Sequence, residues 1–270
     1  MKIITFGTLK GGVGKTMLCF NIGGILSQLG HKVLIIDSDL QGNLTNNIGI
    51  DRTRSSLHTM YDIYNLEENA QPVPEELVSF SPNNKIPLLD MIPGSIFLHK
   101  AELKISSISG REQIFHNYLE DHSEFFAQYD YILIDTNPSM SVVNQNAFLA
   151  SDAILLVSDV SMNSLEGSQL FIALWQEARV RLRREDNIKG FIINDFDGRN
   201  RLSTDFLEYL DTSPDLSDLK ELKMETVIPR NVRITESELA AIPISLYDIQ
   251  SKGCIAITSL IEELFAKNIL

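Results

Sequence analysis

The residues with the clearest chemical potential lie in segment 10–16, which reads Lys-Gly-Gly-Val-Gly-Lys-Thr. Glycines let backbone N–H groups converge on phosphate oxygens, and a helix that begins at the end of such a segment adds the positive end of its dipole. Lys15 can reach the β- and γ-phosphates of a nucleotide, and the Thr16 hydroxyl can ligate Mg²⁺. The strict pattern Gly-x-x-x-x-Gly-Lys-Ser/Thr is not met, because Leu9 stands at its first glycine and Lys10 precedes the glycine pair. The segment therefore predicts a nucleotide phosphate site of unusual form.

Carboxylates follow two apolar runs elsewhere in the chain. Asp37 and Asp39 come directly after the run 34–36, and Asp135 ends the run 131–134. Carboxylates near a phosphate site serve a cation or a reaction, because otherwise they would only repel one another and the phosphates. We expect Asp39 to orient the attacking water and Asp135 to hold Mg²⁺, whereas Asp37 supports either the magnesium shell or the turn.

Apolar runs alternate with helical patterns along nearly the whole chain. Strands are predicted at residues 2–7, 32–37, 87–92, 131–135, 153–158, 188–194 and 224–228. Helices are predicted at residues 14–29, 111–121, 143–150, 164–181, 204–210, 231–240 and 255–267. Near-continuous apolar strands separated by helices favour an α/β fold with a mostly parallel sheet covered on both faces.

The carboxyl ends of the strands in such a sheet form the usual ligand-binding edge. Gly7, Asp37 and Asp135 all fall at predicted strand ends, so the phosphate segment and the carboxylates are expected at one edge. The polar segment 51–85 is predicted to be a surface excursion with a short helix near 57–64.

Length and composition suit one domain over residues 1–270. No apolar run approaches the ~18 residues of a membrane-spanning helix, and no signal peptide precedes the first strand. Cys19 and Cys254 lie far apart without metal-ligand spacing, which fits a reducing, cytoplasmic location. The net charge of −13 opposes nucleic-acid binding unless basic residues gather on one face.

Taken together, these residues resemble the ParA/MinD family of P-loop ATPases, whose Walker A motif is deviant, and its ParA/Soj-like branch in particular. Segment 10–16 is similar to the phosphate cradle of that family, and 37–43 to the ParA form of switch I. Segment 135–139 is similar to switch II, with Asn137 in place of the first proline of Asp-x-Pro-Pro-Ser. Segments 227–233 and 246–253 resemble the part that packs on the adenine and the close of the ParA domain. The resemblance extends from residue 2 to about 265.

The resemblance implies ATP and Mg²⁺ as cofactors. The catalytic residues would be Lys10, Lys15 and Asp39, with Lys10 reaching the phosphates of the other subunit across a nucleotide-sandwich dimer. Nucleotide contacts are expected from Lys10, Gly11, Gly12, Val13, Gly14, Lys15, Thr16, Met17, Asn194, Pro229, Arg230 and Asn231. The metal would be held by Thr16, Asp39 and Asp135.

Family members form ATP-bound homodimers that coat nucleoid DNA non-specifically, and a ParB-like partner stimulates their slow hydrolysis. A cytoplasmic, nucleoid-associated ATPase that positions a plasmid, a chromosome or a protein cluster is therefore expected. Segment 179–201 holds seven basic against four acidic residues and is the predicted DNA-binding face, although the run 181–184 fits the solvated end of a helix equally well. Individual DNA contacts are predicted at Arg199, Arg201, Arg233 and Lys252.

Three other classes of protein have the same phosphate-binding loop. A MinD-like ATPase ends in a basic amphipathic membrane helix, but segment 259–270 has an acidic polar face, so no membrane binding is expected. An iron–sulfur reductase needs two cysteine ligands near a dimer axis, which Cys19 and Cys254 do not supply. A biosynthetic ligase of the same fold is disfavoured by the sequence of segments 37–43 and 229–233. The chain begins at its first strand, so no N-terminal helix-turn-helix extension is expected.

Overall fold

A seven-stranded sheet runs through the molecule in the order β3-β2-β4-β1-β5-β6-β7, and all its neighbouring strands pair in parallel. The computed structural model describes residues 1–52, 54, 56–66 and 71–270. The strands are β1 (Lys2–Gly7), β2 (Val33–Ser38), β3 (Leu89–Ile92), β4 (Tyr131–Thr136), β5 (Ala153–Ser158), β6 (Ile188–Phe196) and β7 (Lys223–Pro229). Every predicted strand is present, with ends within two residues of those expected.

Helices connect the strands and cover the sheet. They are α1 (Lys15–Gln28), α2 (Asn43–Ile48), α3 (Met60–Tyr64), α4 (Pro74–Leu77), α5 (Leu98–Ile105), η2 (Arg111–Gln113), α6 (Ile114–Asp121), α7 (Ser123–Phe126), α8 (Val142–Ala150), α9 (Met162–Arg181), α10 (Arg201–Thr212), η3 (Pro214–Leu216), α11 (Ser217–Leu222), α12 (Val232–Leu239), α13 (Ile244–Tyr247) and α14 (Lys252–Ala266). Within the part of the chain that the structure describes, no helix is long and apolar enough to cross a membrane.

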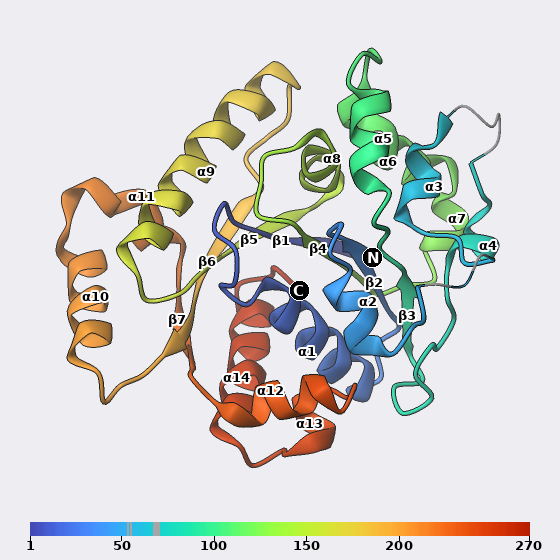
Figure 1. Cartoon of the computed structure of the whole chain (residues 1–270). Helices are drawn as coiled ribbons and strands as arrows, with labels where there is room; N and C mark the ends of the chain where they lie inside the picture. The colour runs from blue at the N-terminus through green and yellow to red at the C-terminus, as the bar shows by residue number, and fades with distance from the viewer. Residues whose placement is uncertain (53, 55, 67–70) are drawn as a thin grey trace.

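The two faces of the sheet pack against different sets of helices (Figure 1). Side chains alternate along each strand: Ile4 and Phe6 of β1 join the core formed with α1 and α14, whereas Ile3 packs with helices on the opposite face. That opposite face is covered by α3, α5, α6 and α8 beside β2 and β4, and by α9, α10 and α11 beside β5 and β6. Both cysteines are buried and unbridged.

The register of the central strands brings the predicted carboxylates together. Asp135 of β4 pairs with Phe6 of β1 on one side and with Asp37 of β2 on the other. The carboxyl ends of these three neighbouring strands therefore form one edge, directly beside the loop that leaves β1 at Gly7.

The excursion between β2 and β3 contains the predicted short helix as α3, which begins after a capping box at Thr59 and Asp62. Residues 53, 55 and 67–70 of the predicted excursion 51–85 lie outside the described residues. Helices α2, α4, α5, α7, α11 and α13 were not predicted. Helix α2 is flanked by Gly42 and Gly49, both in the left-handed region, and its asparagines and threonine gave no helical periodicity.

Candidate nucleotide-binding site

The loop between β1 and α1 has the backbone geometry of a phosphate cradle. Gly12 and Gly14 adopt positive φ angles of 75° and 101°, which side chains rarely allow. A Cβ atom on Gly14 would lie 2.2 Å from Nδ2 of Asn194, and this amide donates a hydrogen bond of 2.8 Å to the carbonyl oxygen of Val13. Asn194, predicted as a base contact, braces the cradle from the end of β6 in this structure.

Lys15 and Thr16 begin α1 directly behind this loop. Lys15 is buried, and this burial lowers the pKa of its ammonium group, while the charges of Asp135 and Asp39 act in the opposite direction. The Thr16 hydroxyl donates a hydrogen bond of 2.6 Å to Oδ2 of Asp135. The structure thus brings together a cation, a hydroxyl and two carboxylates, as predicted.

Asp135 is fully buried at the end of β4. Burial raises the pKa of its carboxyl group to about 8, and the charge of Asp37 adds to this effect, whereas Lys15 and Thr16 oppose it. Its second oxygen, Oδ1, finds no hydrogen-bond partner among the described residues. A buried oxygen without a partner is costly, so the carboxylate has the capacity to accept a further ligand.

The residues present fit a magnesium ion. A hydroxyl and a carboxylate oxygen are hard ligands of the kind that Mg²⁺ takes, usually together with phosphate oxygens and water. Among the described residues, no group of three or more His, Cys, Asp or Glu side chains is arranged to hold a metal ion. The Thr16–Asp135 pair therefore suits a metal that arrives with a nucleotide.

Asp37 and Asp39 have different surroundings. Asp37 is fully buried and accepts hydrogen bonds from the backbone N–H (2.8 Å) and the hydroxyl (2.6 Å) of Thr45, and from the N–H of Asp39 (3.1 Å). Burial raises the pKa of Asp37 to about 6, and the bonds from Thr45 and Asp39 limit that rise. Of the two roles predicted for Asp37, these contacts match support of the turn. Asp39 instead faces the cavity described next and accepts from the N–H of Gln41 (2.9 Å).

A cavity of about 590 Å³ adjoins the cradle. It is lined by Gly11, Gly12, Val13, Gly14, Lys15, Thr16, Met17, Asp39, Gln41, Asn43, Asn47, Pro138, Thr235, Glu238 and Leu239. Seven of the eight predicted cradle contacts, from Gly11 to Met17, line this cavity.

The α12 side of the cavity was not predicted. Asn47 of α2 donates a hydrogen bond of 3.0 Å to Glu238 of α12, and burial raises the pKa of that carboxyl group. No local motif marks these two residues, which lie 191 positions apart. Their contact joins α2, which begins at the end of segment 37–43, to α12, which begins within segment 227–233.

The predicted base contacts Pro229, Arg230 and Asn231 are not among the residues that line the cavity. Arg230 is exposed and forms an ion pair of 2.6 Å with Asp195. The side chain of Asn231 caps α12 by accepting from the backbone N–H of Arg233 at 2.8 Å. Their contact with a base stays a prediction.

Lys10 is likewise held outside the cavity. Its ammonium group donates to Oδ2 of Asp159 and to the hydroxyl of Ser161, each at 2.7 Å. Asp159 also accepts from the hydroxyls of Ser161 and Ser164 at 2.6 Å. The loop between β5 and α9 thus binds the ammonium group of Lys10, the lysine that the family resemblance assigns to phosphate binding.

The predicted basic face over segment 179–201 is divided by β6. Arg179 to Lys189 lie around the amino end of this strand, and Arg199 and Arg201 follow its carboxyl end. Nine residues of strand separate the two groups by about 30 Å. The basic residues of this segment therefore do not form one continuous face, and DNA binding by either group stays a prediction.

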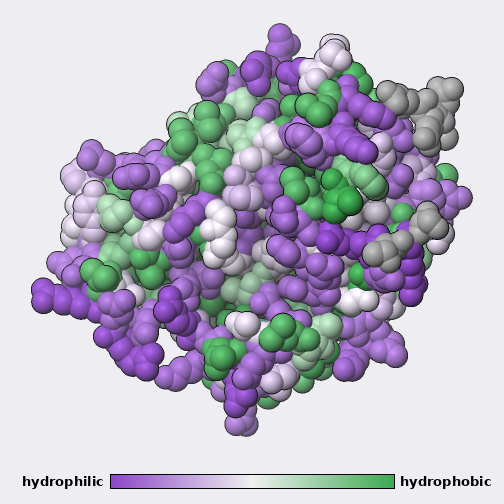
Figure 2. Space-filling model, in the orientation of Figure 1, coloured by the Kyte–Doolittle hydropathy of each residue, from purple (hydrophilic) through white to green (hydrophobic). Residues whose placement is uncertain are grey.

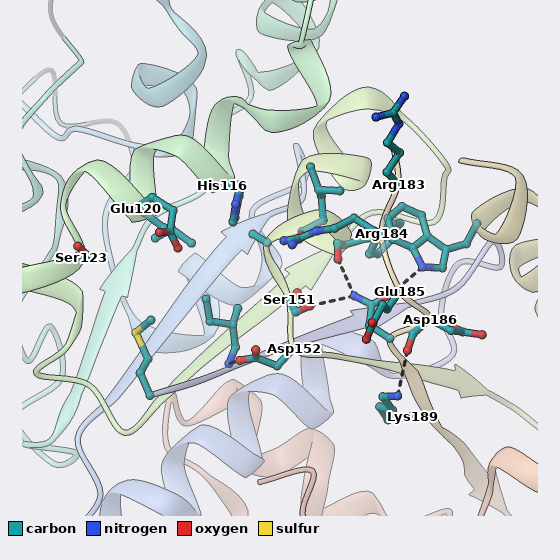
Figure 3. A pocket seen from close by; sticks show the side chains of 18 residues that line it. His116, Glu120, Ser123, Ser151, Asp152, Arg183, Arg184, Glu185, Asp186 and Lys189 are labelled. Atoms are coloured by element: carbon teal, nitrogen blue, oxygen red, sulfur yellow. Dashed lines mark hydrogen bonds between the residues drawn. The ribbon is translucent and has the colours of Figure 1, made fainter. Parts of the chain in front are cut away.

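Arg183 and Arg184, at the amino edge, line a second cavity, also of about 590 Å³ (Figure 3). Arg183, Arg184 and Lys189 are interspersed there with the carboxylates of Glu120, Asp152, Glu185 and Asp186. Arg184 reaches across and donates a hydrogen bond of 2.6 Å to the carbonyl oxygen of Leu149, at the end of α8. The mixed charge and this capping contact indicate a structural brace rather than a DNA-binding face.

Three of the four predicted DNA contacts form ion pairs with nearby carboxylates: Arg199 with Asp197 (3.0 Å), Arg201 with Asp205 (3.6 Å) and Arg233 with Glu236 (2.7 Å). Arg199 and Arg201 are almost fully exposed, with side-chain exposures of 90% and 92%. Lys252, at the start of α14, has no ion pair within the described ranges.

Comparisons with known proteins agree with this geometry. A family model described as AAA domain matches residues 1–188. Chromosome partitioning protein ParA of Caulobacter vibrioides NA1000 is 31% identical over 99% of this chain and 95% of its own. Sporulation initiation inhibitor protein Soj of Bacillus subtilis 168 is 31% identical over 98% of both.

The fold is shared with solved structures as well. The septum site-determining protein MinD of Pyrococcus horikoshii OT3, complexed with Mg-ADP, superimposes with a TM-score of 0.73 at 24% identity, over 100% of this chain and 98% of that one. The predicted fold class, a mostly parallel sheet flanked by helices, is thereby confirmed. Because the sequence matches extend over nearly the whole of both chains and include the cradle, this chain belongs to the ParA/MinD family of P-loop ATPases with a deviant Walker A motif.

Proposed function

We propose that this chain binds Mg²⁺-ATP in the cradle and hydrolyses it slowly, as the timing step of a cycle that positions cargo in the cell. The observation that carries this proposal is the buried group of Lys15, Thr16 and Asp135 behind a loop with two left-handed glycines. A lysine behind a glycine-rich loop at the start of a helix is suited to bind phosphate, and the adjacent hydroxyl and carboxylate are suited to the Mg²⁺ that accompanies it. The Mg-ADP bound to the related MinD supports the same ligand class here.

Each side chain has a distinct part in this proposal. Lys15 and the loop N–H groups bind the phosphates, and Thr16 and Asp135 hold the metal, with Asp39 close by. When bound, Mg²⁺ would neutralise charge that develops on the phosphate oxygens. Asp39, in the cavity wall, orients the attacking water, a role that requires a carboxylate close to the phosphate.

The contacts of Lys10 are consistent with a role in a dimer. For it to contact a nucleotide, its ammonium group must leave Asp159 and Ser161, since these hold it outside the cavity. We propose that ATP favours a homodimer in which Lys10 exchanges Asp159 for the phosphates of the other subunit. Such an exchange is a ligand-driven shift between two states.

The proposed dimer binds double-stranded DNA non-specifically, and a ParB-like partner stimulates hydrolysis and releases it. The name of the Caulobacter relative, a chromosome partitioning protein, supports this cargo cycle. DNA contacts would come from Arg199, Arg201, Arg233 and Lys252, in a nucleoid-associated state. The ion pairs of the three arginines and the net charge of −13 weaken this binding.

A second candidate function is the positioning of a protein cargo without DNA. It is favoured by the same ion pairs, because an arginine already paired with a carboxylate attracts phosphate less strongly. A membrane cargo has less support, since α14 carries Glu262 and Glu263 towards its end. The side of the molecule seen in Figure 2 shows separate hydrophobic patches in a mostly hydrophilic surface rather than one extended apolar face.

The test is the binding of duplex DNA with ATP, with ADP and without nucleotide, over a series of salt concentrations. Binding that requires ATP and falls steeply with salt supports the DNA cycle, because salt dependence reports phosphate contacts. Absence of binding in every state, with ATP turnover intact, would exclude DNA and leave the protein-cargo function.

A further inference from the structure

The switch II loop between β4 and α8 has an asparagine where the family motif has its first proline. A proline ring fixes φ near −65°, so the motif residue restrains its own loop. Asn137 has no such ring, so the loop depends on hydrogen bonds, one of which is local: Oδ1 of Asn137 accepts from the hydroxyl of Ser139. The hydrogen bonds around this loop show what holds it.

Asn144, in the first turn of α8, is fully buried and donates hydrogen bonds to the loop. Its amide nitrogen lies 2.8 Å from the carbonyl oxygens of both Asn137 and Ser139, and 3.0 Å from Oδ1 of Asn137. A carboxamide has two N–H donors, so the two backbone carbonyls occupy its donor capacity. The same loop is closed by a 2.9 Å bond from the N–H of Ser139 to the carbonyl of Asn137.

The surroundings of the Asn144 amide oxygen indicate that the side chain is oriented by the hydrogen bonds that its nitrogen donates. Oδ1 is buried and has no hydrogen-bond partner among the described residues. An unpaired buried oxygen is unfavourable. An asparagine at this position is therefore explained by what its nitrogen does for the loop, rather than by general core packing.

The tethered loop lies against the nucleotide site. Pro138, between the two tethered carbonyls, lines the cavity beside the cradle. A Cβ atom on Gly11 would lie 3.8 Å from Cγ of Pro138, which is ordinary van der Waals contact. The position of Pro138 relative to the phosphate loop thus depends on the bonds that Asn144 makes.

We propose that Asn144 is a positioning residue for ATP hydrolysis, which takes over the restraint that a proline at position 137 would provide. This inference rests on the proposed hydrolysis. Asn144 touches no nucleotide in this account; it acts through Pro138 and the backbone of the loop. Substrate affinity should therefore depend on it far less than turnover does.

The first experiment is ATP turnover by Asn144→Ala. We expect kcat to fall about tenfold while KM changes by less than about threefold, because small displacements near a reacting centre reduce rates strongly. Adding Asn137→Pro should restore kcat to within about threefold of the unchanged chain. Two features favour the proline: Thr136 before it ends a strand, and Asn137 is not among the residues with positive φ.

Asn146→Ala is the matched control. Asn146 is equally buried on the same helix, but it bonds the backbone of Arg111, Val142 and Phe115 instead of the switch II loop. Its replacement should lower thermal stability, and Asn137→Pro should not reverse that loss. Rescue of both variants by the proline would mean a general stabilising effect and would overturn the proposal.

A second measurement, hydrogen exchange, does not require ATP hydrolysis. Hydrogen exchange at the Ser139 amide should accelerate at least about tenfold in Asn144→Ala and slow again in the double variant. If the unchanged chain hydrolyses no ATP, the proposed function fails. Hydrogen exchange alone then tests whether Asn144 holds the switch II loop. Unchanged exchange, turnover of Asn144→Ala within about twofold of the unchanged chain, or a folded but inactive double variant would each contradict the inference. Should Asn144→Ala not fold, a folded and active double variant supports it and an unfolded one contradicts it.

Discussion

The phosphate cradle and the predicted DNA contacts are both built around basic side chains, but the structure treats them in opposite ways. Lys15 is buried among backbone and carboxylates that hold it at one place. Arg199 and Arg201 are about nine-tenths exposed and paired with acidic residues of their own turn. A buried charge can be positioned by packing, whereas an exposed one is set by whichever ions and partners are nearby.

This difference explains why one region is recognisable from its motif and the other is not. The cradle needs particular glycines and a lysine at fixed spacing, because its geometry is dictated by the backbone. A surface that attracts DNA needs only net positive potential, which many sequences can supply. Substitutions in each region should therefore act differently.

Lys15→Ala should reduce nucleotide affinity by about a hundredfold or more, because a charge-assisted contact to phosphate is lost from a buried site. Titration with ADP and ATP measures this. Lys10→Ala is the control: because Asp159 holds Lys10 outside the cavity, ADP affinity should be nearly unchanged. Equal losses in the two variants would mean that the structure assigns the lysines wrongly.

Asp39→Ala should keep ATP affinity within about threefold and slow turnover about a hundredfold, because positioned acid–base groups contribute at least this much. Steady-state hydrolysis and nucleotide titration separate the two effects. Asp37→Ala should differ in kind: it leaves the N–H and hydroxyl of Thr45 without their acceptor, so its main effect should be a lower melting temperature. Normal turnover in Asp39→Ala would remove this residue from the mechanism.

Asp159→Asn should make ATP-dependent dimerisation a few-fold easier. The substitution removes the charge that holds Lys10 but keeps the size of the side chain, and a partly exposed pair of this kind contributes at most about 1 kcal/mol. Sedimentation velocity with ATP at several protein concentrations measures the effect. A dimer that forms less readily than in the unchanged chain would show that Asp159 supports Lys10 in the active state instead.

Exchanging both Arg199 and Arg201 for glutamate should weaken DNA binding a few-fold at low salt. Asp197→Asn with Asp205→Asn should strengthen it, since each change frees an arginine from its ion pair. Anisotropy of a labelled duplex at two salt concentrations detects both changes. If neither pair of substitutions alters binding, this face is not the one that contacts DNA.

Much of the fold could be predicted because its strands are buried on both faces and read as continuous apolar runs. Every residue of β2, β4 and β5 is buried, which is the pattern that the sequence displays. Helix α2 was missed for the opposite reason: it has six residues, two flanking glycines and no apolar stripe. Tertiary contacts, rather than local propensity, determine that it forms.

The residues of the site also differ in whether local sequence or tertiary packing determines their position. Lys15, Thr16 and Asp135 could be predicted together, because parallel strands must bring their carboxyl ends to one edge. Asn47 and Glu238 could not, because their contact depends on how α12 packs against α2. Similarly, the sequence shows that Asn137 replaces a proline, but only the structure shows that Asn144 holds the loop.

The most direct test of the central claim is ATP turnover by the unchanged chain and by Lys15→Ala, each with Mg²⁺ and with excess chelator. We expect slow hydrolysis that requires the metal and disappears in Lys15→Ala, because the cradle and the Thr16–Asp135 pair act together. Turnover that persists in Lys15→Ala, or that is indifferent to Mg²⁺, would show that this cradle is not the site of hydrolysis.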